Sequence, residues 1–178
     1  MLRKLIVPFI VIFGLTNMAK AAEPDPSIFF GHWQGTGYAE NADSIYFATT
    51  SRDLDVEIAA TGDGGFSIRT TTVTHDSGNP QDPKVKTKQS LIIFNKTNNA
   101  AVFRATPDGD PMLGNPMWWS RIKGSTLHTY MVQIDADGRW QVQDYARTLS
   151  GQGMSLEFTR QRDGQAVRQV NGKLIRIN

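Results

Sequence analysis

The sequence DLDVEIAA at residues 53–60 alternates strictly between acidic and apolar side chains over its first six positions. Because successive side chains of a β-strand point to opposite faces of a sheet, Leu54, Val56 and Ile58 share one face and the carboxylates share the other. The turn-forming sequence TGDGG follows directly, and a stretch rich in Thr then occupies residues 66–75. This succession predicts an antiparallel hairpin with one buried face and one solvated face.

The same pattern of short strands and turn residues continues along the chain, without a linker or a long stretch of helical periodicity. Short connections require antiparallel neighbours, and a meander that closes removes both of its exposed edges. The sequence therefore predicts an all-β fold, a single antiparallel meander of about eight to ten strands closed into a barrel, with an open β-sandwich as the alternative. Eleven segments are candidates for these strands: residues 33–38, 45–50, 53–60, 66–75, 85–94, 100–106, 117–123, 126–134, 139–148, 154–162 and 167–177.

The N-terminus has the features of an export signal. Two basic residues precede an apolar run at residues 5–15, and Ala19 and Ala21 form a small-x-small cleavage site. An apolar core of about eleven residues is shorter than the roughly 20 that a membrane-spanning helix needs. We therefore expect a signal peptide at 1–21, a β-barrel domain at 22–178, a periplasmic or secreted location and no membrane span after processing.

Charge and cysteine content exclude several functions. Without the signal, the chain contains 16 basic and 17 acidic residues. The processed chain therefore has no excess of positive charge with which to bind nucleic acid. The chain contains no cysteine, which excludes disulfides, thiol catalysis and Cys-ligated zinc. Lys84, Lys86 and Lys88 occupy alternate positions of one expected strand. We interpret them as solvated side chains that protect an exposed sheet edge from pairing with another chain.

The sequence Phe30-Gly31-His32-Trp33 resembles the Gly-x-Trp element that begins the first strand of lipocalins and of the wider calycin group of barrels. The resemblance implies that Gly31 and Trp33 help to close one end of the barrel. It also implies that an Arg from near the end of the chain packs on the indole, as cation–π attraction favours. The sequence leaves the choice of that Arg open among Arg160, Arg162, Arg168 and Arg176.

Motifs for catalysis or metal binding are absent from the sequence. The three histidines, His32, His75 and His128, lack the spacing of a zinc site. Two Asp-Gly pairs, at 108–109 and 137–138, indicate turns rather than calcium loops. The acidic residues of 53–60 are expected to form a solvated face. We therefore assign no catalytic residue, no metal and no cofactor.

The central strands carry the best candidates for a ligand site. Trp118 and Trp119 are adjacent, so one must face the barrel interior and the other must face outward. An interior that binds a small hydrophobic or amphipathic molecule combines an apolar wall with a few polar anchors. The residues of suitable chemistry are Arg104, Trp119, Arg121, His128 and Tyr130.

Three functions remain open from the sequence. The first is an exported barrel that binds a small hydrophobic or amphipathic molecule in its interior. The second is a non-catalytic envelope protein that binds a protein partner through an exposed surface, with Trp118 or the loop of Met112 and Leu113 as candidates. The third is an isomerase or hydrolase on the same barrel, which would use His128, Tyr130 or Arg121 inside the cavity.

Overall fold

The computed structural model describes residues 25–42, 49–75, 85–151 and 153–177. The predicted signal peptide and its cleavage site lie outside these residues. The described residues form ten strands and three short 3-10 helices. In chain order they are η1 (Pro26–Phe29), β1 (Gly31–Asn41), β2 (Thr49–Ala60), η2 (Gly62–Gly64), β3 (Phe66–His75), β4 (Val85–Lys96), β5 (Val102–Thr106), η3 (Pro111–Leu113), β6 (Met117–Lys123), β7 (Thr126–Ile134), β8 (Trp140–Ser150), β9 (Gly153–Arg162) and β10 (Gln165–Ile177).

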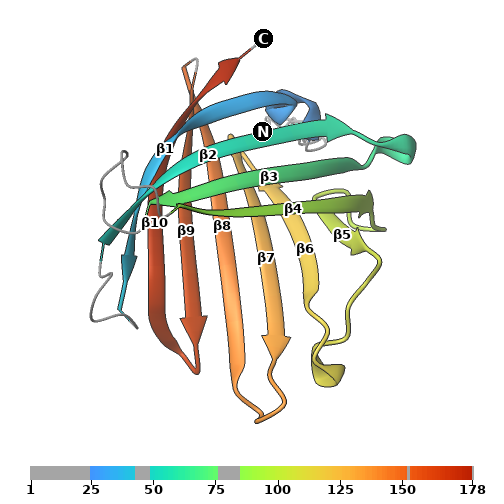
Figure 1. Cartoon of the computed structure of the whole chain (residues 1–178). Coiled ribbons are helices and arrows are strands. Elements are labelled where there is room, and N and C mark those ends of the chain that lie inside the picture. Colours follow the sequence, from blue (N-terminus) through green and yellow to red (C-terminus); the bar gives the residue numbers. More distant parts are fainter. Residues whose placement is uncertain (1–24, 43–48, 76–84, 152, 178) are drawn as a thin grey trace, which may run out of the picture.

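The strands form a closed antiparallel barrel, in which every strand pairs with its neighbours in sequence and β1 also pairs with β10 (Figure 1). The prediction of a single closed meander is therefore confirmed, and the open sandwich is wrong. The separate strand expected at 45–50 is also wrong at its C-terminal end, because Thr49 and Thr50 begin the same strand that contains 53–60. The other residues of that expected strand, up to residue 48, are outside the described part.

The hairpin of β2 and β3 has the two faces that the sequence predicts. Leu54, Val56 and Ile58 are buried in the barrel. The alternating carboxylates lie on the outer face, where Asp55 accepts hydrogen bonds from neighbouring side chains and Glu57 forms an ion pair with Arg69. The alternation in 53–60 therefore determined which face of β2 is buried.

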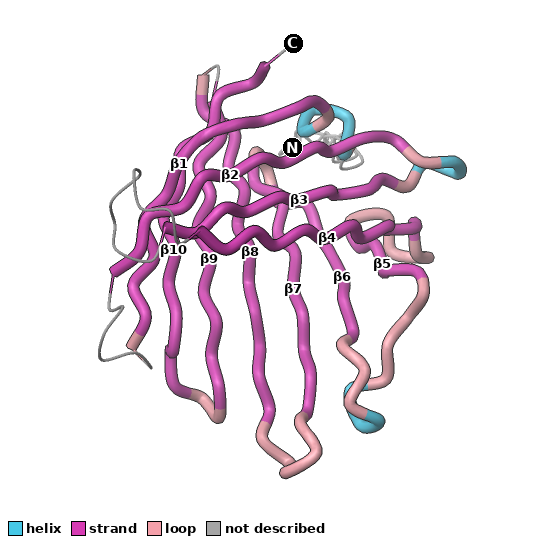
Figure 2. The backbone as a smooth tube through the Cα atoms, viewed as in Figure 1, coloured by secondary structure: helices cyan, strands magenta, loops and turns pink. Residues whose placement is uncertain are grey.

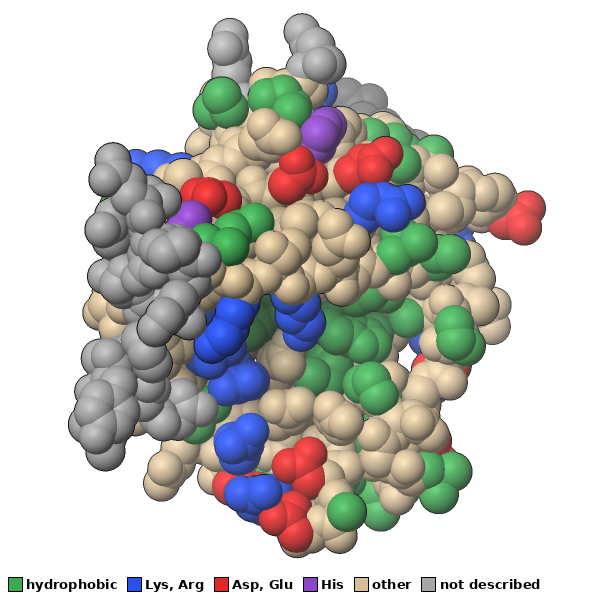
Figure 3. Space-filling model, viewed as in Figure 1, with side chains coloured by type: hydrophobic (Ala, Val, Ile, Leu, Met, Phe, Trp, Pro, Cys, Tyr) green, Lys and Arg blue, Asp and Glu red, His purple; other side chains and the backbone are tan. Residues whose placement is uncertain are grey.

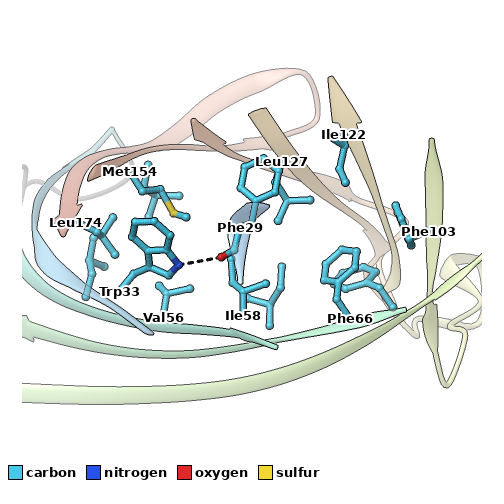
Figure 4. Packing of buried hydrophobic residues seen from close by; sticks show 14 of the residues in the cluster. Phe29, Trp33, Val56, Ile58, Phe66, Phe103, Ile122, Leu127, Met154 and Leu174 are labelled. Atoms are coloured by element: carbon cyan, nitrogen blue, oxygen red, sulfur yellow. Dashed lines mark hydrogen bonds between the residues drawn. The ribbon is translucent and has the colours of Figure 1, made fainter. Parts of the chain in front are cut away.

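One end of the barrel is filled by apolar side chains (Figure 4). Phe29 of η1 is fully buried in this cluster, and its carbonyl oxygen accepts a hydrogen bond of 3.0 Å from the Trp33 indole. Arg176 lies with its guanidinium 4.5 Å from the centre of the Trp33 ring and donates a hydrogen bond to the Ile28 carbonyl. Among the arginines considered from the sequence, Arg176 is thus the one that packs on Trp33.

Strands β1 and β10 approach each other closely where they close the barrel. A Cβ atom placed on Gly35 would lie 1.9 Å from the backbone carbonyl oxygen of Lys173, and one placed on Gly37 would lie 2.9 Å from that of Asn171. Residues larger than glycine would therefore force the two strands apart at this seam. Gly31, at the start of β1, has a φ of +139° and lies against the Arg176 side chain.

The strand pairing of the barrel wall is short on both sides of β5. Strand β4 pairs with β3 over residues 85–94, whereas its described pairing with β5 covers residues 93–96 only. The short β5 is visible beside the long β4 in Figure 2. The first part of β4 is therefore an edge in the described structure. No helix among the described residues is long and apolar enough to span a membrane.

Candidate functional site

The barrel encloses a hollow with two adjoining lobes beyond the apolar end. Their volumes are about 460 Å³ and about 390 Å³. Seven residues line both lobes, which shows that the lobes are parts of one hollow: Thr70, Thr72, Lys88, Gln143, Tyr145, Arg147 and Arg160. The depression lies beneath the β4 edge in Figure 3.

The inward face of several strands changes from apolar to basic where it leaves the packed end. Arg52 continues the face of Leu54, Val56 and Ile58 on β2. Arg160 follows Leu156 and Phe158 in the same way on β9, and Arg168 precedes Val170 and Leu174 on β10. Because neighbouring strands run in opposite directions, the three arginines lie at the same end of the barrel.

Arg147 of β8 is the most deeply buried cation of the hollow, with only 3% of its surface exposed. Its Nη1 donates a hydrogen bond of 3.3 Å to the Thr129 hydroxyl, and its guanidinium lies 5.3 Å from the centre of the Tyr145 ring. Its Nε is buried without a hydrogen-bond partner in the described structure. Burial lowers the pKa of Arg147 to about 10, so the side chain stays charged at neutral pH.

Tyr145 lies at the centre of the hollow, next to these arginines. Burial raises the pKa of its hydroxyl above the ordinary value, while the charges of Arg147, Arg160, Arg168 and Arg52 act in the opposite direction. The hydroxyl is therefore neutral at pH 7 and donates a hydrogen bond of 2.9 Å to the Gln143 side-chain oxygen. It is a hydrogen-bonding group in this state rather than a base.

The second lobe has an apolar wall on the side of β4, β6 and β7. Ile92, Trp118 and Met131 line it, and the Trp118 ring lies 6.1 Å from that of Tyr145. Trp118 is therefore the inward-facing member of the tryptophan pair. The hollow thus combines a basic, polar region with an apolar region, which is the combination that suits an amphipathic ligand.

The five residues predicted as ligand anchors lie on the outer wall of the barrel, so their expected position inside the cavity is wrong. The structure brings them together on β5, β6 and β7: Arg104, Trp119, Arg121, His128 and Tyr130. Residues paired across adjacent strands share a face, and the inward face of β6 and β7 is taken by other side chains, including Trp118 and Thr129. A register shifted by one residue would have placed the five inside.

On the outer wall four of these five side chains form a stacked ladder, whereas Arg104 forms an ion pair with Asp108. The Tyr130 ring lies 5.1 Å from that of Trp119 and 5.6 Å from that of His128, and Arg121 lies 5.9 Å from its centre. His128 is 3.5 Å from Asp144, which also faces outward. An enzyme that uses His128, Tyr130 or Arg121 inside the cavity is therefore excluded, and neither lobe is lined by His, Asp or Glu among the described residues.

The basic lining was missed by the sequence analysis, although a signal for it is present. On β2, β9 and β10 an alternating apolar face ends in an arginine at matching positions, at Arg52, Arg160 and Arg168. Lys86 and Lys88 lie on the described edge of β4, as the lysine alternation suggested, but they line the hollow as well as meeting solvent. Lys84 lies outside the described residues.

The exposed surface contains part of the apolar patch that the sequence suggested. Met112 and Leu113 of η3 are 79% and 76% exposed. Trp118 does not contribute to this patch, because it lines the hollow. No group of three or more metal-ligating side chains occurs within the described ranges.

Comparisons with known proteins give only distant alignments to solved structures. No family model matches the chain, and no curated protein matches it. Among solved structures, an S-type phycobiliprotein lyase from Guillardia theta aligns over 87% of this chain and 94% of its own, at 10% identity and a TM-score of 0.40. A 12:0-ACP thioesterase from Umbellularia californica aligns over 82% of this chain and 75% of its own, at 10% identity and a TM-score of 0.17. Similarity this low transfers no function, so the functional argument depends on the barrel itself.

Proposed function

We propose that this protein is an exported, calycin-like barrel that binds a small amphipathic molecule in its interior. The observation that carries the proposal is the hollow between the packed end of the barrel and the β4 edge, with lobes of about 460 Å³ and 390 Å³. Sites for small molecules commonly enclose about 300–1,000 Å³. A barrel with only a structural role would fill this space with side chains.

The lining supports an amphipathic ligand rather than a purely apolar one. Trp118, Met131 and Ile92 offer apolar surface, while Tyr145 and Arg147 offer polar groups in the same hollow. The apolar region favours transfer of a hydrocarbon group from water, and the polar groups would fix its orientation.

Binding of a neutral probe tests for an interior site independently of the charge of the natural ligand. The fluorescent amine N-phenyl-1-naphthylamine is uncharged at neutral pH, so its emission reports access to the apolar region. Thr72 lines both lobes, and Thr72→Trp should fill part of the hollow and weaken probe binding by about tenfold or more. Val73→Trp is the matched control, because Val73 pairs with the outward-facing Asp53. Equal binding by the two variants would contradict an interior site.

Export is the second part of the proposal. The basic N-terminus, the apolar run and the small-x-small site support cleavage after residue 21. Expression of the full chain in a bacterial host, followed by cell fractionation and N-terminal sequencing, should find a processed protein that begins at Ala22. Native mass spectrometry of that protein, gently purified, would identify a retained ligand. An unprocessed chain in the cytoplasm would contradict export.

A role in binding a protein partner is the second candidate, because Met112 and Leu113 are exposed on η3. Contiguous exposed apolar surface marks interaction sites, and these two neighbours are the most exposed large hydrophobic side chains among the described residues. Replacement of both by Ser should abolish partner capture and leave probe binding unchanged. Unchanged capture would exclude this loop.

A further inference from the structure

The described lining of the hollow carries several cationic side chains. No Asp or Glu occurs among the described residues that line either lobe. The cationic side chains of the lining are Arg52, Lys86, Lys88, Arg147, Arg160 and Arg168. Arg147 is the buried member of this set, and a buried cation is normally paired with an anion because its desolvation is unfavourable. The hollow is therefore an electropositive site.

The contacts of Arg147 and Arg168 show that neutral groups hold these guanidinium groups in place. Arg147 donates to the Thr129 hydroxyl, and its buried Nε has no hydrogen-bond partner among the described residues. Arg168 donates from Nε to the side-chain oxygen of Asn41, at 2.5 Å. Hydroxyl and amide oxygens orient a guanidinium without cancelling its charge. Both side chains are thus positioned and charged before any ligand arrives.

We propose that the hollow binds the dianionic head of an amphiphile, of the phosphate-monoester type, through Arg147, Arg168 and Lys88. This inference rests on the proposed function and adds the chemical class of the ligand. A guanidinium presents a planar fork of N–H donors that matches the oxygens of a phosphate. A phosphate monoester has a charge near −2 above about pH 7, since its second pKa is about 6. A single carboxylate would compensate a smaller part of the charge of Arg147, Arg168 and Lys88.

The lining also determines how such a ligand would be oriented. Arg168 lines the first lobe only, whereas Trp118 and Met131 line the second lobe only. The head therefore occupies the basic first lobe, and the hydrocarbon chain extends along the second. Arg147 and Lys88 line both lobes and mark the boundary between the two parts of the ligand.

The opening of the hollow has a basic side and an apolar side, as the two lobes do. Lys86 and Lys88 lie on the β4 edge, and Lys and Arg side chains gather along one side of the depression while hydrophobic side chains occupy the other (Figure 3). A cleft lined by charge of one sign raises the local concentration of oppositely charged ligands. An anionic amphiphile would thus be attracted head first to the region that binds it.

A series of ligands with one chain length and different heads tests the proposal. Dodecyl phosphate, laurate, dodecanol and dodecyltrimethylammonium compete with N-phenyl-1-naphthylamine at pH 8 and low salt. We expect dodecyl phosphate to bind about tenfold more tightly than laurate, and laurate to bind more tightly than dodecanol. A factor of ten is what one additional charge-assisted hydrogen bond supplies. The cationic amphiphile should bind most weakly.

Single substitutions test where the anionic head of the ligand binds. Arg147→Gln should weaken dodecyl phosphate about tenfold or more and change dodecanol less than about twofold. Arg121→Gln is the matched control, because Arg121 lies on the outer wall above Tyr130. If Arg147→Gln does not fold, as judged by circular dichroism, Arg168→Gln and Lys88→Gln test the same site from less buried positions.

The outcomes separate this inference from the proposed function. Equal binding of dodecanol and dodecyl phosphate, with retention of the neutral probe, would overturn the anionic head and leave the binding barrel intact. Equal binding of laurate and dodecyl phosphate would overturn the dianion. Loss of the neutral probe itself would overturn the proposed function. Lysophosphatidic acid with the same chain length distinguishes the two possible sources of the phosphate group. If it binds more tightly than dodecyl phosphate, the ligand is a lipid with a phosphate headgroup. If it binds more weakly, the ligand is a soluble phosphate ester.

Discussion

Replacement of Arg147 by Met should stabilise the ligand-free protein while it destroys the proposed head site. The side chain is 3% exposed, carries a charge at neutral pH and has one hydrogen bond, of 3.3 Å, to a neutral hydroxyl. A residue selected for the stability of the barrel would not be a buried cation with this environment. Methionine is unbranched, flexible and apolar, so it can occupy the space of the arginine stem without the charge.

The magnitude follows from the cost of burying the charge. Burial lowers the pKa of Arg147 to about 10, well below the pKa of a solvated guanidinium. One pKa unit corresponds to about 1.4 kcal/mol, so the buried charge costs the folded state about 3 kcal/mol. Loss of the long hydrogen bond to Thr129 and of the contact with the Tyr145 ring offsets about 1 to 2 kcal/mol of this. The net gain in unfolding free energy is about 1 to 2 kcal/mol, or about 3–6 °C in Tm.

The assay is thermal unfolding of the delipidated wild type, Arg147→Met and Arg121→Met between pH 6 and pH 9. In this range Arg147 is protonated in both the folded and the unfolded state, so the gain in Tm should not depend on pH. The folded-state pKa is lowered, so the cost of the charge would disappear only as the pH rises through about 10. Arg121→Met should change Tm by less than about 2 °C, as is typical of surface substitutions.

A lower Tm for Arg147→Met than for the wild type, with an unchanged control, would refute this reasoning. It would show that the contacts of the guanidinium with Thr129 and Tyr145 contribute more than its desolvation costs. Arg147 would then be a structural residue, and its presence in the hollow would no longer indicate an anionic ligand.

Three further predictions concern the fold. Phe29→Ala should lower the free energy of unfolding by about 3–5 kcal/mol, because Phe29 fills the closed end of the barrel; a loss below about 1 kcal/mol in urea unfolding would show that η1 is dispensable. Gly35→Val should prevent folding, since even a Cβ atom would lie 1.9 Å from a backbone carbonyl oxygen of β10; a soluble variant with a wild-type circular dichroism spectrum would contradict this. Burial raises the pKa of Asp55, but hydrogen bonds with Gln34 and His32 lower it to a net value below the ordinary one, so its ionised form stabilises the fold above about pH 4 and this contribution is lost as the pH falls further. Asp55→Asn should therefore show a smaller decrease in the urea midpoint between pH 5 and pH 3 than the wild type, and an equal decrease would assign the acid sensitivity to other groups.

The sequence could predict the fold because each strand carries its own information. The alternation in 53–60 and the turn after it specify a hairpin locally, and repeated short connections leave antiparallel neighbours as the simplest arrangement. The separate strand at 45–50 was wrong because β2 begins at Thr49 and continues through 53–60. No breaker residue between them marks a boundary, so the division was not justified by the pattern.

The candidate site could not be predicted in the same way, because it depends on which face of each strand points inward. On β6 and β7 both faces carry apolar and polar residues, so periodicity alone cannot distinguish Trp118 from Trp119. The outer ladder of Trp119, Tyr130 and His128 has residues of the chemistry that a binding site needs, so residue type alone favours the wrong face. The structure places it on the opposite face from the hollow.

The amino-acid sequence by itself determined the strand pattern, the absence of cysteine chemistry and the buried face of β2, because these properties depend on residues near one another in the chain. Only the tertiary structure decided that Arg176 packs on Trp33 and that Arg147 and Arg168 face one hollow. These residues come from strands whose relative position depends on the closure of the barrel and on the register of every hairpin. A one-residue change in any register would exchange the two faces of a strand, so the site is a property of all the pairings together.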